Sequence, residues 1–270
     1  MSIINQIAFR HLRSGHSFGF ISFTTFLSIA GLMIGVASLN MISSFSDGFS
    51  MEVQRKLSTI DGHLRIQKYS QFSDYSISAE ELAVLMDTLS FHPEIKTTIP
   101  FIEKRGMIRK GKSTEGIIVY GVPESALSEV FQLEHFLTQG NLDFNGEKQI
   151  ILGEGLADLL QIKLGDKAVV FDLEKSLTEN ILSAGSFVVS GIMKTGFSEY
   201  DKLLAFLPLE DAAELFDFSG EYSGVITMVY HPEDIDRLDQ EIIGYIGSYP
   251  YITSSWKERH GSLFQWLSVY

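Results

Sequence analysis

The clearest feature of the sequence is a long apolar segment close to its N-terminus. The run from Ser17 to Ser46 contains no Asp, Glu, Lys, Arg or His. As a helix rising ~1.5 Å per residue, this run would reach roughly 45 Å, more than the ~30 Å of a bilayer's hydrocarbon core. A cleaved signal peptide has an apolar region of only about 7–15 residues. The pattern therefore predicts one transmembrane helix rather than a signal peptide.

Small residues recur on one face of this segment. Ser28, Gly31, Gly35 and Ser38 are separated by three, four and three positions, a spacing that aligns them along a helix. Stripes of small residues let helix backbones approach closely in lipid. Chance is the alternative, because small residues are common in such helices. We interpret the stripe as a helix-packing face.

Apolar residues continue at helical spacing beyond the charge-free run. Phe49, Val53, Leu57 and Ile60 recur every three or four positions, so we expect the helix to leave the membrane as a stalk. A stripe in a segment surrounded by water needs a partner that buries it. The simplest partner is a second stalk that returns to the membrane.

The end of the chain carries such a second stripe. Its members, again at helical spacing, are Trp256, His260, Leu263, Phe264 and Leu267. We expect the two stripes to form an antiparallel seam; the alternative is that both pack onto the domain. The second stripe stops in mid-pattern at residue 270, which predicts that a further membrane helix follows in the complete protein.

Between the stripes, the pattern alternates between strands and helices. The residues from Ser78 to Glu81 form a capping box, and the helix that it starts has an apolar face. Strands are predicted at 63–67, 97–109, 115–120, twice within 150–173, and at 186–192, 203–207, 224–230 and 251–254, with helices at 209–216 and 232–246. This order predicts the α+β fold class.

The same order suggests boundaries within the chain. Residues 1–46 would hold a cytoplasmic amphipathic helix and the transmembrane helix, and residues 256–270 would form the return stalk. The exported domain would span 47–255. Its β-α-β part, about 61–122 and 203–255, would bracket a β-rich insert of about 123–202.

Charge predicts both the orientation and the class of partner. Arg10 and Arg13 precede the apolar run, whereas Asp47 and Glu52 follow it, which places the N-terminus in the cytoplasm. All 34 acidic residues lie beyond position 46 with 19 of the 21 Lys and Arg, so the exported part carries about −15. This charge argues against nucleic acid as a partner and against tight docking on anionic lipid. The chain has no cysteine, which excludes disulfides and thiolate metal sites.

No motif points to catalysis or to a bound cofactor. The segment Gly153–Asp158 looks like a dinucleotide loop, but Asp158 stands where the third glycine would be, so a helix start is the better interpretation. Phosphate-binding G-x-x-x-x-G-K-[ST], H-E-x-x-H and G-x-S-x-G motifs do not occur. Three carboxylates are assigned to the wet face of a helix: Asp234, Asp236 and Asp239. We expect no enzyme activity, no cofactor and no metal.

Short motifs follow one another along the whole chain in a specific order. They are Ala8–Arg13, Ile21–Phe23, Leu27–Gly31, Ile34–Ala37, Ser44–Phe49, Tyr120–Pro123, Ile151–Ala157, Leu164–Asp166, Gly191–Gly196, Glu199–Asp201 and Trp256–Arg259. Together they resemble lipoprotein-releasing permeases of the LolC/LolE type, within the superfamily of MacB-like and FtsX-like permeases. Each piece is short, whereas the combination is specific.

The resemblance implies a subunit of an ABC transporter in the bacterial inner membrane that works by mechanotransmission. Such permeases have four transmembrane helices, with the large periplasmic domain between the first and the second. A second permease subunit and a separate ATP-hydrolysing ABC subunit complete the complex. It passes its lipoprotein substrate from the membrane to a periplasmic lipoprotein carrier.

Two departures from the family pattern leave alternatives open. The chain lacks the last three membrane helices, so we expect it to be a permease truncated after the periplasmic domain. The region from Phe171 to Phe187, where LolC-type permeases carry a carrier-docking hairpin, is short and has no proline-rich tip. A LolC-like or LolE-like role, a MacB-like efflux permease and an FtsX-like activator of a periplasmic partner all remain possible.

Overall fold

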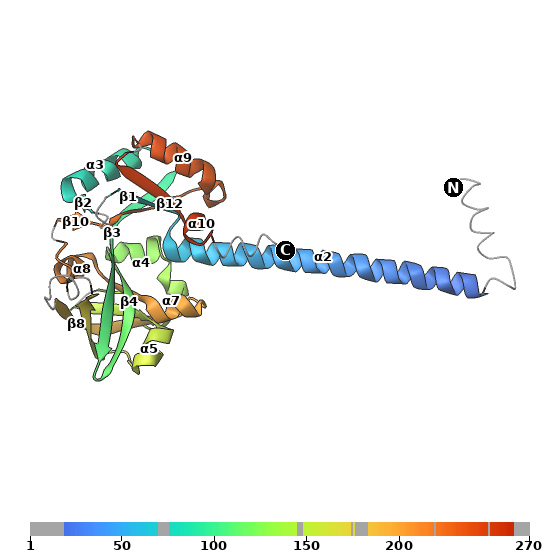
Figure 1. Ribbon diagram of the computed structural model, residues 1–270, viewed down its shortest axis with the longest axis horizontal. Coiled ribbons are helices and arrows are strands. Elements are labelled where there is room, and N and C mark those ends of the chain that lie inside the picture. Colours follow the sequence, from blue (N-terminus) through green and yellow to red (C-terminus); the bar gives the residue numbers. More distant parts are fainter. Residues whose placement is uncertain are drawn as a thin grey trace. The chain divides into compact units, whose positions relative to one another are not determined.

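The computed structural model describes residues 19–69, 76–144, 148–173, 175, 183–218, 220–247 and 249–261, with the backbone alone at 19–22 (Figure 1). The chain divides between Val53 and Gln54 into two compact units. The predicted amphipathic helix at 1–18 lies outside the described residues.

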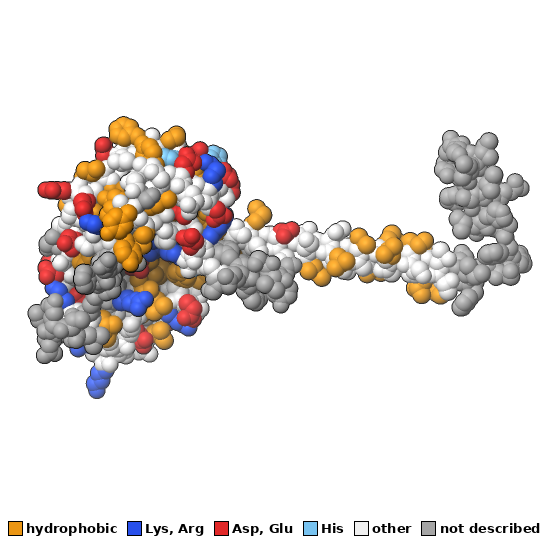
Figure 2. All heavy atoms as spheres, turned by 45° about the horizontal axis from the view of Figure 1, so that its top comes forward, with side chains coloured by type: hydrophobic (Ala, Val, Ile, Leu, Met, Phe, Trp, Pro, Cys, Tyr) orange, Lys and Arg blue, Asp and Glu red, His pale blue; other side chains and the backbone are white. Residues whose placement is uncertain are grey.

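The first unit contains most of a long helix, α2, which runs from Gly19 to Asp61. Its apolar part is long enough to cross a membrane, and none of that part is buried within the protein. Phe26 and Leu32, for example, are each 69% exposed. Figure 2 shows hydrophobic side chains along this helix and mixed charges on the globular unit. The predicted long apolar helix near the N-terminus is thereby confirmed.

The second unit is built on one ten-stranded sheet. Its strands run in the order β12-β1-β11-β3-β4-β9-β6-β8-β5, and β7 pairs with β3 and β8. The bounds are Leu64–Lys68 (β1), Ile95–Lys110 (β3), Ser113–Val122 (β4), Leu137–Gly140 (β5), Gln149–Gly153 (β6), Lys167–Asp172 (β7), Ala184–Met193 (β8), Leu204–Pro208 (β9), Gly224–Val229 (β11) and Tyr251–Ser255 (β12). Ile77–Ser78 (β2) and Glu221–Tyr222 (β10) form a separate small pair.

Helices cover the sheet in two groups (Figure 1). Their bounds are Ala79–Ser90 (α3), Glu124–Glu129 (α4), Leu133–His135 (η1), Glu154–Leu160 (α5), Ser198–Leu203 (α7), Leu209–Leu215 (α8), Pro232–Asp234 (η2), Ile235–Tyr245 (α9) and Trp256–Arg259 (α10). Helices α3 and α9 lie near β3, β11 and β12, whereas α5, α7 and α8 lie near β4, β6 and β9. The predicted capping box is present at the start of α3, where the Ser78 side chain accepts a hydrogen bond from the Glu81 amide.

The 16-residue strand β3 connects the two halves of the sheet. Its first half pairs with β11, from Ile95 to Phe101. Its second half pairs with β4 on one side and with β7 on the other. Two apolar cores lie on opposite faces of the sheet. In β6, for example, Ile151 belongs to the core that contains Phe101 and Ile60 of α2, whereas its neighbours Ile150 and Leu152 belong to the core that contains Ile108.

The α+β class is confirmed, and most predicted strands occur within two residues of their expected bounds. The short elements α4, η1, β5 and α7 were not predicted, because three to six residues carry too little periodicity. The placement of Asp239 on a wet face was wrong, since its side chain is buried. Asp239 lies four residues after Ile235 and three before Ile242, on the buried face of α9. The proposed domain boundaries stay a prediction.

Candidate functional site

The last residue of α2, Asp61, is the centre of a buried network of charges. The helix ends here because Gly62 turns the chain into β1 with a φ of +71°, a conformation that favours glycine. A side chain at Gly62 would also lie 2.2 Å from a methyl carbon of Ile226. A carboxylate at the C-terminus of a helix is unfavourable beside the helix dipole, so Asp61 requires cations nearby.

The first cation comes from the far end of the chain. Arg259 lies on α10, whose capping box is formed by Ser255 and Glu258. Its Nε lies 3.3 Å from Asp61 Oδ2, and its Nη2 donates to the carbonyl oxygens of both Asp61 (3.0 Å) and Gly62 (3.3 Å). The guanidinium therefore caps the end of α2 from a segment 198 residues away.

His260, the next residue, contacts the same carboxylate. Its Nε2 lies 2.6 Å from Asp61 Oδ2 and 3.0 Å from the hydroxyl of Tyr200. Burial raises the pKa of Tyr200 above its ordinary value, so its hydroxyl stays protonated. The network thus extends from α2 through His260 to α7, which carries Tyr200.

Arg65 holds the opposite side of the Asp61 carboxylate. It donates to Asp61 Oδ1 at 2.8 Å and to the Tyr120 hydroxyl at 2.6 Å, and it forms an ion pair with Glu103. Its guanidinium also lies over the rings of Phe101 and Tyr120, at 5.4 and 5.2 Å from their centroids. Arg65 therefore joins the end of α2 to strands β3 and β4.

The two guanidinium groups respond differently to this shared environment. Burial lowers the pKa of Arg65, but Tyr120, Asp61 and Glu103 outweigh burial and raise it above its ordinary value. Burial and then repulsion by Arg65 lower the pKa of Arg259, although Asp61 acts in the opposite direction. The carboxylate of Asp61 is thus needed by both cations.

We name Asp61, Arg65, Tyr200, Arg259 and His260 the junction cluster. A hollow of about 260 Å³ adjoins it. Within the described ranges, no group of three or more His, Cys, Asp or Glu is arranged to hold a metal ion. Removing one partner from a buried ion pair typically costs 3–5 kcal/mol, because the other charge is left unpaired. The arrangement is suited to holding two chain segments together.

The predicted packing face lies on the charge-free part of α2. Ser28, Gly31, Gly35 and Ser38 are all exposed, and a methyl group added to either glycine would meet nothing within 4 Å. Within the described residues, nothing covers this face. Its role stays a prediction.

The predicted stalk residues are only partly described. Phe49 is exposed, whereas Val53, Leu57 and Trp256 are buried. His260 belongs to the junction cluster. Three members of the second stripe lie outside the described residues: Leu263, Phe264 and Leu267. The antiparallel seam itself stays a prediction.

Sequence reasoning did not identify Asp61, Arg65, Tyr200 or Arg259 as site residues. Two signals were available. Asp61 and Arg65 have opposite charges four residues apart, and Tyr200 and Arg259 stand within motifs that carry the family resemblance. Neither signal could show that all four side chains meet.

Comparisons with known proteins show the family of this chain. A family model described as the MacB-like periplasmic core domain matches residues 25–245. The lipoprotein-releasing system transmembrane protein LolC of Neisseria meningitidis is 27% identical over 88% of this chain and 57% of its own length. LolE of Haemophilus influenzae is 23% identical over 96% of this chain and 62% of its own. The chain thus spans about three fifths of these relatives.

Among solved structures, the periplasmic region of MacB from Actinobacillus actinomycetemcomitans has a TM-score of 0.49 and 14% identity. That alignment covers 77% of this chain and 95% of the MacB region. The family assignment rests on the family model, whose match extends over most of the chain. The chain belongs to the family of proteins with a MacB-like periplasmic core domain.

Proposed function

We propose that this chain supplies the first transmembrane helix and the periplasmic domain of an ABC transporter permease that releases lipoproteins from the inner membrane. The observation that carries the proposal is the similarity to LolC and LolE proteins over 88–97% of the chain. The proposed partners are a separate ATP-hydrolysing subunit, a second permease subunit and a periplasmic lipoprotein carrier.

The junction cluster gives this proposal a mechanical basis. Asp61 ends the helix that leaves the membrane, and Arg259 and His260 lie where the chain starts to return. A buried ion pair has few alternative geometries, so displacement of either segment is transmitted to the other. In this proposal, ATP hydrolysis on another chain moves the membrane helices, and the domain follows as one body.

The proposal is tested by reconstituting the complete permease with its second permease and ATPase subunits in proteoliposomes that hold a labelled lipoprotein. We expect ATP-dependent transfer of the lipoprotein to purified carrier in solution. Hydrolysis of ATP without transfer would contradict lipoprotein release. In that case the MacB-like family match would favour an efflux permease or an FtsX-like signalling subunit instead.

The orientation is tested separately. Because Arg10 and Arg13 precede the apolar run and no acidic residue does, a reporter fused after Tyr270 is expected in the periplasm. Alkaline phosphatase should be active at this position, and a cytoplasmic reporter inactive. The reverse pattern would show that the orientation is wrong.

A further inference from the structure

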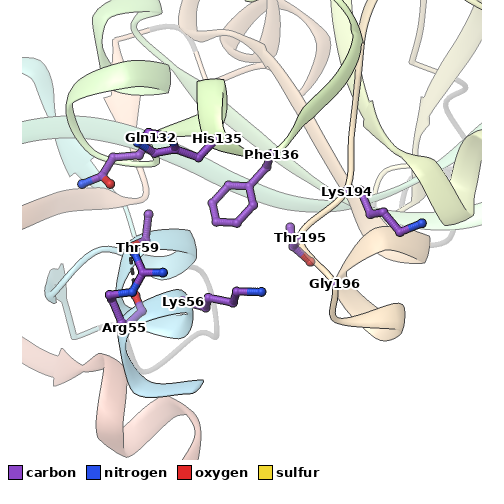
Figure 3. Close-up of a pocket in the computed structure, with 9 residues that line it drawn as sticks. All are labelled: Arg55, Lys56, Thr59, Gln132, His135, Phe136, Lys194, Thr195 and Gly196. Carbon is purple, nitrogen blue, oxygen red and sulfur yellow. Dashed lines mark hydrogen bonds between the residues drawn. The ribbon is translucent and has the colours of Figure 1, made fainter. Parts of the chain in front are cut away.

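A second feature near the end of α2 is a pocket lined by cations. It has a volume of about 490 Å³ and lies between the last turns of α2, the η1 region and the loop after β8 (Figure 3). Arg55 and Lys56 contribute from α2, His135 from η1 and Lys194 from the loop. We name it the basic pocket. Among the described residues that line it, none is acidic.

This concentration of positive charge is unusual for the chain. The whole chain has a net charge of −13, so most of its surface repels anions. In the basic pocket, Arg55, Lys56 and His135 line a concave surface, and Lys194 lies at its edge with its side chain directed away from the pocket. Concave sites lined by one sign of charge raise the local concentration of ions of the opposite sign. The pocket therefore favours an anionic ligand.

Lys56 is the cation best placed to meet a ligand. Figure 3 shows its side chain extending across the pocket toward Thr195 and Gly196. Its Nζ lies 3.7 Å from the place that a Cβ would take at Gly196. Within the part of the chain that the structure describes, Lys56 has no acidic partner. Lys194, in contrast, pairs at 2.6 Å with Glu154.

The wall opposite Lys56 is held in a fixed conformation. Asp201 accepts hydrogen bonds from the amide and the hydroxyl of Thr195, at 2.7 and 2.8 Å, and from the Gly196 amide at 3.3 Å. Because these donors are already used, the loop shapes the pocket and leaves ligand binding to the cationic side chains. Lys and Arg nitrogens pair strongly with phosphate oxygens through charge-assisted hydrogen bonds.

The distance of Arg55 and Lys56 from the charge-free run indicates where a phosphate ligand would come from. Arg55 follows Phe45, near the end of the charge-free run, by ten residues, about 15 Å along a helix. The headgroup layer occupies roughly 5–8 Å of that length. The side chains of Arg55 and Lys56 span much of the remainder. A soluble ion would not require this proximity to the membrane segment.

We propose that the basic pocket binds the phosphate group of a membrane-lipid headgroup and so fixes this side of the domain at the membrane surface. A single site of this kind is compatible with the acidic surface elsewhere, which opposes broad docking on anionic lipid. The proposal does not depend on which substrate the permease moves.

The test uses the full chain in maltoside micelles and isothermal titration calorimetry. Dibutyrylphosphatidylglycerol is the probe, because its chains are too short to partition into micelles. We expect saturable binding that the Arg55→Gln/Lys56→Gln double variant weakens at least tenfold. Lys56→Arg should retain binding, since it keeps the charge. The matched control is Lys112→Gln/Lys167→Gln, which removes the same charge from exposed positions outside the pocket and should bind like the wild type.

Two results would overturn the proposal. Binding of inorganic phosphate as tight as that of the lipid would assign the pocket to a soluble anion. Equal binding by the wild type and the double variant, or no saturable binding at all, would show that the pocket is not a phosphate site. Circular dichroism of each variant shows whether a loss of binding comes from unfolding.

Discussion

The junction cluster and the basic pocket both include residues from the last turns of α2, but they differ in how their cations are paired. In the junction cluster, the cations Arg65 and Arg259 share one buried carboxylate, and Glu103 adds a second anion beside Arg65. In the basic pocket, cations outnumber anions at an open surface. A buried charge has to be paired inside the protein, whereas a solvated charge can remain available to a ligand. The first arrangement is therefore suited to holding structure together, and the second to binding.

The strongest test of this contrast removes the shared carboxylate. Asp61→Asn keeps the size of the side chain but removes the anion that Arg65 and Arg259 share. Arg65 retains its pair with Glu103, whereas the largely buried Arg259 loses its ion pair. We expect a loss of about 3–5 kcal/mol in the free energy of unfolding, measured by urea titration of the full chain in micelles. Asp236→Asn is the matched control, because Asp236 is exposed in its pair with Lys257, and it should cost less than ~1 kcal/mol. Equal effects would show that the junction cluster contributes no more than a surface pair.

A pH titration tests whether an unpaired charge in the interior of the domain is destabilising, because it protonates the buried His63. His63 accepts a hydrogen bond from the Val229 amide at its Nδ1, and burial lowers its pKa to about 4. The unfolded chain therefore binds a proton near the ordinary pKa of 6.5, while the folded chain does not. The contribution of His63 to the free energy of unfolding should be constant above pH 6.5. It should reduce that free energy by about 3 kcal/mol as the pH falls to 4.

The control for this titration is an exposed histidine. His63→Asn should flatten the stability profile between pH 4 and 6.5, whereas His231→Asn should leave its slope unchanged. The measurement is the urea midpoint at several pH values. A slope that survives His63→Asn would assign the pH dependence to other groups.

A third prediction asks whether the junction continues along the two apolar stripes. If Val53 and Leu263 face each other in a seam, a charge at either position forfeits about 1.5–3 kcal/mol of apolar burial. In the complete permease, Val53→Glu or Leu263→Glu should reduce substrate release and leave ATP hydrolysis largely intact. Met51→Glu, at an exposed position of α2, should have little effect.

The same seam can be tested by cross-linking, because the chain has no native cysteine. Cysteines introduced at Val53 and Leu263, or one turn away, should form a disulfide on oxidation. Normal release by the charged variants, with no cross-link along the two segments, would mean that the stripes pack onto the domain.

The smallest effect is expected in the charge-free part of α2, where only shape can direct packing. Gly35→Leu should place a side chain in the helix-packing face and weaken assembly with partner subunits by on the order of 1 kcal/mol, about fivefold. Co-purification measures this loss, and membrane insertion should be unaffected. Val36→Leu, on the neighbouring face, is the control. Unchanged co-purification of the Gly35→Leu variant would favour a chance arrangement of small residues.

Local patterns in the sequence determined a large part of this protein. The absence of charge from Ser17 to Ser46 predicted a long apolar helix, the element that satisfies its own backbone in lipid. The capping box at Ser78 and the alternating strands follow from interactions between residues a few positions apart. Short-range periodicity was enough to predict the α+β class.

The tertiary structure alone decided which distant residues meet. Asp61 and Arg259 are 198 positions apart, and no local pattern specifies that β1 brings the end of α2 next to the end of β12. The basic pocket likewise joins Lys56, His135 and Lys194 from three separate stretches. The burial of Asp239 could not be predicted from the sequence of its helix either. The sequence gives the charge, but only the packing of the helix shows that the carboxylate is buried. Periodicity assigns a residue to a face of its own element, whereas its partners depend on how the elements pack.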